Sequence, residues 1–67
     1  MQVQISNKMA REFTATFEAI QTLASYQKPG YSNNVMGLHQ NADKMRELAA
    51  RLMAHADSIE LAIQLAD

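Results

Sequence analysis

Residues 35–66 read VMGLHQNADKMRELAARLMAHADSIELAIQLA, and this stretch decides the fold. Its apolar side chains recur at alternating spacings of three and four, which is the heptad pattern of a helix that packs in coiled-coil fashion. We term these residues the seam, and they are Val35, Leu38, Ala42, Met45, Ala49, Leu52, Ala56, Ile59, Ile63 and Ala66. The seam predicts a helix over about 33–66 and is expected to form the core of its contact with another helix.

A shorter amphipathic pattern precedes this helix. One apolar face is formed by Met9, Phe13, Phe17, Ile20 and Ala24, at spacings of four and three. That period predicts a helix over about 6–27, for which Ser6 or Asn7 is a suitable N-cap. A turn over residues 28–32 follows, because Pro29 disfavours helix at the residue before it and Gly30 suits the positive φ of a type II turn.

The start of the second helix has more than one reading. Residues 32–34 are Ser-Asn-Asn, three candidate N-caps in a row, and with Ser32 as the cap Tyr31 and Met36 would form a hydrophobic staple. Alternatively, the regular helix begins at Asn41, which is then its N-cap. If the helix begins earlier, Asn41 lies in the apolar arc, where a buried Asn sets the register of packed helices.

Length and composition narrow the classes of protein. The chain has 67 residues, six basic and seven acidic side chains, a net charge of −1 and no cysteine. Disulfide frameworks, thiolate zinc sites and cysteine nucleophiles are therefore excluded. No apolar stretch is long enough to span a membrane, and no secretion signal is recognisable. We expect a single domain over residues 1–67, in the cytoplasm of a bacterium, or of the host cell if a phage or mobile element encodes the chain.

The two helices differ in length, and this difference predicts self-association. The predicted helices have about 22 and about 34 residues, so at about 1.5 Å per residue their lengths differ by roughly 18 Å. In a tight hairpin Phe13 would lie near Glu47 or Leu48, so the last dozen residues, apolar on all sides, would project beyond the first helix. A small chain without disulfides or metal usually gains stability by oligomerising. The sequence therefore predicts an all-α antiparallel helical hairpin that dimerises into a four-helix bundle, through Leu52, Ala56, Ile59, Leu61, Ile63 and Leu65.

Few residues could take part in catalysis or bind a metal ion. His39 and His55 point to nearly opposite sides of one helix, so they cannot ligate one metal ion, and no carboxylate pair has the apolar surroundings that acid–base catalysis needs. We expect no enzyme activity, no metal and no cofactor. The favoured function is a non-catalytic protein–protein interaction module, a small oligomeric regulator or adaptor that binds a partner protein by a helix face. The candidate partner-binding residues are Lys8, Arg11, Glu18 and Tyr31.

Two other functions stay open. A nucleic-acid-associated regulator would present Lys8 and Arg11 from paired hairpins, although two or three charges per chain give weak, salt-sensitive binding, so nucleic acid is an unlikely partner. A small-ligand-binding protein would form its pocket between chains, near Arg51 and His55.

Overall fold

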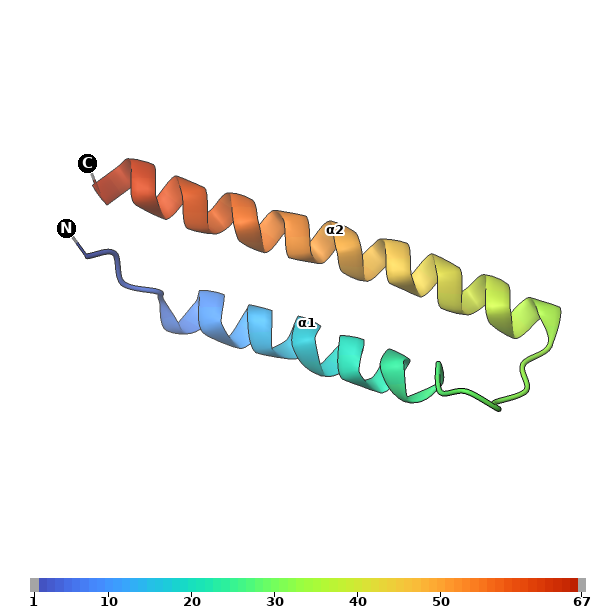
Figure 1. Cartoon of the computed structure of the whole chain (residues 1–67). Helices are drawn as coiled ribbons and strands as arrows, with labels where there is room; N and C mark the ends of the chain where they lie inside the picture. Colours follow the sequence, from blue (N-terminus) through green and yellow to red (C-terminus); the bar gives the residue numbers. More distant parts are fainter. Residues whose placement is uncertain (1, 67) are drawn as a thin grey trace.

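The computed structural model describes residues 2–66 and contains two helices (Figure 1). Helix α1 spans Asn7–Ser25 and helix α2 spans Val35–Ala66. The helices run antiparallel and pack against each other, and residues 2–66 contain no strand. The all-helical two-helix prediction is confirmed, and the predicted helix ends, 6–27 and 33–66, differ from the observed ends by at most two residues. Residues 1 and 67 lie outside the described chain.

Side-chain caps explain where both helices begin. The backbone of Ser6 is extended, and its Oγ accepts the amide hydrogen of Met9 at 3.1 Å. Asn34 does the same for α2, because its Oδ1 accepts the amide hydrogen of Gly37 at 2.7 Å. Each oxygen satisfies an amide that has no partner within the helix. Asn34, rather than Ser32 or Asn41, is therefore the N-cap of the second helix.

Residues 26–34 connect the helices and form a longer link than the predicted five-residue turn. The carbonyl of Lys28 accepts the amide hydrogen of Tyr31 at 3.2 Å, and Gly30 has a φ of +89°. Pro29 and Gly30 thus form the turn that the sequence predicted. Beyond this turn the chain continues without regular structure to α2, which begins past the end of α1 (Figure 1).

The long connection changes the register between the helices. The ring centroids of Phe13 and His55 are 5.6 Å apart, so Phe13 lies about two turns further along α2 than the expected Glu47 or Leu48. The predicted overhang of the last dozen residues is therefore wrong. Helix α2 extends past α1 at both ends, and residues 2–6 continue beside its final turns (Figure 1). Ile5 accordingly lines the same hollow as Ile59.

Burial within the hairpin follows one row of residues on each helix. Leu48 and Thr16, exposed by 2% and 3%, are the two buried residues of the described chain. Half-buried residues continue both rows at spacings of seven, and Ala19, Ile20 and Ala42 beside these rows are also half-buried. We term these rows the contact line, formed by Met9, Thr16 and Leu23 on α1 and by Asn41, Leu48, His55 and Ala62 on α2.

The contact line is not the seam, and in this respect the sequence-based interpretation was wrong. Leu48 lies between seam residues in sequence, whereas the seam residues Leu52 and Ile59 remain 39% and 43% exposed. A helix with apolar residues on adjacent rows can pack at more than one rotation, and α1 packs beside the seam rather than on it. The hairpin measures 50 × 17 × 15 Å, so it is a single layer of helices that leaves the seam exposed apart from the half-buried Ala42.

Candidate functional site

The contact line divides the surface of the hairpin into two unlike sides. Successive residues of a helix are rotated by about 100°, so each seam residue lies about 40° to 120° from the nearest contact-line residue of α2, in the direction that leads from His55 to Ala56. On α1 the same direction of rotation from Thr16 leads to Phe13, Phe17 and Ile20. Because the helices are antiparallel, this direction leads to the same side of the hairpin on both. We term this side the apolar face: the seam together with Ala10, Phe13, Phe17, Ile20 and Ala24.

Side-chain contacts agree with this geometry. A hollow of about 320 Å³ lies between the helices near the start of α1. Phe13 and Ile59 line it together, although they come from different helices. The remaining lining residues are Ile5, Met9, Ala10, Thr14, His55 and Ser58. The two helices therefore contribute large apolar side chains to one shared surface.

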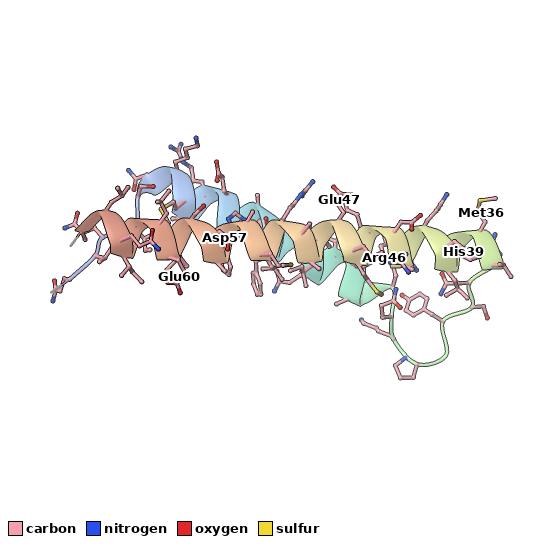
Figure 2. All side chains as sticks on the ribbon, turned by 90° about the horizontal axis from the view of Figure 1, so that it is seen from above. Met36, His39, Arg46, Glu47, Asp57 and Glu60 are labelled. Carbon is pink, nitrogen blue, oxygen red and sulfur yellow. The ribbon has the colours of Figure 1, made fainter. Side chains whose placement is uncertain are left out.

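The opposite side, which we term the charged flank, carries three of the ion pairs of the described residues. Glu47 accepts from Arg51 at 2.6 Å and pairs with Lys44 at 3.4 Å, and Lys8 lies 4.0 Å from Glu12. Figure 2 shows Glu47 along one edge of α2. All these side chains are substantially exposed, so each pair contributes little to stability.

A second hollow of about 290 Å³ opens on the charged flank. Arg51 and Glu12 face it from the two helices, and its other lining residues are Ala15, Thr16, Ala54 and His55. The small-ligand alternative placed a pocket between chains near Arg51 and His55. In the structure this hollow forms within one chain.

The outer surface of α2 forms a third, polar region. Figure 2 shows His39, Arg46, Asp57 and Glu60 on the side of α2 that is turned away from α1. Asp43 accepts from Arg46 there at 3.1 Å. No three His, Asp or Glu side chains of residues 2–66 are close enough to hold a metal ion.

His55 lines both hollows and contacts two residues of α1, Thr16 and Phe13. Its Nε2 is 3.0 Å from Thr16 Oγ1, and its ring meets the ring of Phe13 edge-on at 74°. The Thr16 hydroxyl donates its proton to the carbonyl of Glu12 at 3.1 Å. Because a hydroxyl has a single proton, Nε2 of His55 donates to Thr16 while Thr16 donates to Glu12, and in the other His55 tautomer Thr16 donates to Nε2 instead. Sequence reasoning placed His55 at the border of the packing surface and missed Thr16 as its partner, although Thr16 lies seven residues from both Met9 and Leu23.

The predicted self-association residues fall on both sides of the hairpin. Four belong to the apolar face: Leu52, Ala56, Ile59 and Ile63. Leu61 and Leu65 lie about 80° to 120° from His55 in the other direction, on the charged flank, and are 54% and 79% exposed. These two leucines do not form one patch with the other four.

The predicted partner-binding residues are not brought together. Lys8 lies on the charged flank beside Glu12, whereas Arg11 and Glu18 lie on the side of α1 that faces away from α2. Arg11 donates to the carbonyl of Asn7 at 3.4 Å. Tyr31 is in the connection at the other end of the molecule and is 58% exposed. The structure therefore gives these four residues no common site.

Comparisons with protein-family models, curated proteins and solved structures found no match to this chain. Within the described residues, neither helix is long and apolar enough to cross a membrane. The candidate functional site is therefore defined by the hairpin itself, and it is the apolar face.

Proposed function

We propose that this chain is a non-catalytic protein–protein interaction module that works as a homodimer. Two hairpins associate into a four-helix bundle, and the bundle binds a partner protein through an exposed helix face, as a small regulator or adaptor does. One observation carries the proposal: the hairpin leaves most of its large apolar side chains in contact with solvent. Phe13, Phe17 and Ile63 are 47%, 50% and 42% exposed, while Leu48 is the one large apolar residue that the hairpin buries.

Surface area supports self-association. The chain has an accessible surface of 5607 Å², about 1,400 Å² more than the roughly 4,200 Å² of a compact monomer of its mass. Its radius of gyration is 15.8 Å, against about 11 Å for a globular domain of this length. A standard protein interface buries about 800 Å² on each partner. The excess surface is thus larger than one such interface requires.

Sedimentation equilibrium of the full chain at micromolar concentration tests the dimer. The expected mass is twice 7.5 kDa, and helix content measured by circular dichroism should fall as dilution dissociates the dimer. A monomeric mass together with full helix content and cooperative unfolding would contradict the proposal.

Affinity capture from the native cell tests the outside partner. The tagged chain, recovered under native conditions and analysed by mass spectrometry, is expected to retain one other protein in near-stoichiometric amount. Retrieval of the chain alone would contradict the adaptor or regulator part of the proposal. Retention of RNA or DNA that is lost steeply with added salt would favour the nucleic-acid alternative instead.

A further inference from the structure

The hairpin buries a mixed row of polar and apolar residues and leaves the wholly apolar rows beside it largely exposed. Its contact line includes Thr16, Asn41 and His55, each of which carries a polar side-chain group. The apolar face beside it has ten positions on α2 and five on α1, and every one of them is Ala, Val, Leu, Ile, Met or Phe. Folded proteins usually cover apolar rows of this size, so the exposed apolar face is the unusual feature of the hairpin. We therefore interpret the contact line as one part of a core that is completed only when the apolar face is also covered.

We propose that a second copy of this chain docks on the apolar face by a two-fold axis, and that the Leu61 and Leu65 edge stays outside this contact. This inference rests on the self-association proposed above and identifies the surface that it uses. Docking would join the contact lines and apolar faces of two copies into one continuous core. Each helix would then bury a stripe wider than 100°, as helices of a four-helix bundle do.

The arrangement of large and small side chains on the apolar face is suitable for packing against a second copy. Large residues form one row of α2 (Leu38, Met45, Leu52 and Ile59), and a parallel row is mostly alanine (Ala42, Ala49 and Ala56). Packed surfaces interdigitate when the large residues of one partner lie against the small residues of the other. A two-fold contact uses the same patch on both copies, so the patch must carry both kinds of residue, as this face does. The alanines also let two backbones approach closely. The face carries no charge, so pairing it with itself brings no like charges together.

The accessible surface area of the hairpin also supports a second copy as the partner. The excess of about 1,400 Å², taken over the whole hairpin, is larger than the roughly 800 Å² that a standard interface takes from each partner. The hollow of about 320 Å³ beside Phe13 and Ile59 opens on this face, so the docked copy would cover it. The charged flank, with Glu47, Arg51, Leu61 and Leu65, would remain free for the outside partner.

Thiol labelling tests the inference, because the chain has no cysteine of its own. Ala56 lies on the apolar face and Ala54 on the charged flank, two residues apart on α2, and both are exposed in the single hairpin. The variants Ala56→Cys and Ala54→Cys therefore form a matched pair. In the full-length dimer, Ala56→Cys should react with a thiol reagent at least ten-fold more slowly than Ala54→Cys. The two rates should converge when the protein is diluted to monomer.

The possible results distinguish a failure of this inference from a failure of the proposed self-association. A dimeric mass with equal labelling rates, or with protection of Ala54→Cys instead, would overturn the apolar face as the contact. A monomeric mass at every concentration would overturn self-association itself. As a second measurement, Phe17→Glu should lower the dimer association constant at least ten-fold, whereas Leu65→Glu should leave the mass by light scattering dimeric. Dissociation by Leu65→Glu alone would also overturn the inference.

Discussion

The imidazole of His55 hydrogen-bonds the hydroxyl of Thr16 across the hairpin, with Nε2 3.0 Å from Oγ1. This bond joins residues that are 39 positions apart, and it lies in the middle of the contact line. A one-turn slip of either helix would separate the two groups and leave the half-buried imidazole nitrogen without a partner. An unpaired buried polar group is costly, so the bond selects this register among others that apolar contacts alone would allow.

Replacing the hydroxyl tests this role. Thr16→Val keeps the shape of the side chain and removes the hydrogen-bond partner of His55, so it should lower the free energy of unfolding by about 1–2 kcal/mol. Urea denaturation followed by circular dichroism measures the change. Thr22→Val is the matched control, because Thr22 donates to the carbonyl of Glu18 as Thr16 does to Glu12 but has no bond across the hairpin. Equal effects of the two variants would show that the His55 bond contributes nothing.

The most buried large side chain should also be the most sensitive to truncation. Leu48 is 2% exposed, and Leu48→Ala should destabilise the fold by about 2–5 kcal/mol through lost burial and the cavity left behind. Leu65→Ala, at a site 79% exposed, is the control and should have a small effect. Thermal unfolding of both variants at one protein concentration makes the comparison. A greater loss of stability in Leu65→Ala than in Leu48→Ala would show that Leu48 is not at the centre of the packing.

Gly30 should resist substitution for a conformational reason. Its φ is +89°, yet a Cβ added there would meet no atom within 4 Å, so space is not the constraint. Gly30→Ala should therefore lower stability by about 1–2 kcal/mol, the cost of the left-handed backbone for an L-residue. Gly30→Asn should cost less, since asparagine visits this region more readily. Calorimetric melting temperatures that rank Asn below Ala would contradict this explanation.

Ion pairs should contribute far less to the stability of the fold than apolar packing does. Glu47 has two basic partners, Lys44 and Arg51, but its side chain is 49% exposed. Glu47→Gln should therefore change the free energy of unfolding by less than about 1 kcal/mol. The dimer mass should likewise persist from low to high sodium chloride, because the proposed contact carries no charge. Dissociation of the dimer by salt would assign the contact to the charged flank.

Local chemistry made several features predictable from the sequence. Ser6 caps α1, Pro29 and Gly30 form the turn, and each helix runs where its apolar period predicts. These features depend on residues within about four positions of one another, so neighbouring side chains are sufficient to specify them. The all-apolar seam was likewise recognisable, because its period is a property of one helix.

The tertiary structure alone decided how the two helices meet. The rows that face each other are those of Thr16 and Leu48, and Phe13 lies against His55 rather than Leu48. A nine-residue connection permits several registers, and apolar residues on adjacent rows permit several rotations. Contacts between residues about 40 positions apart select one combination, and that selection leaves the strongest apolar pattern in the sequence on the surface.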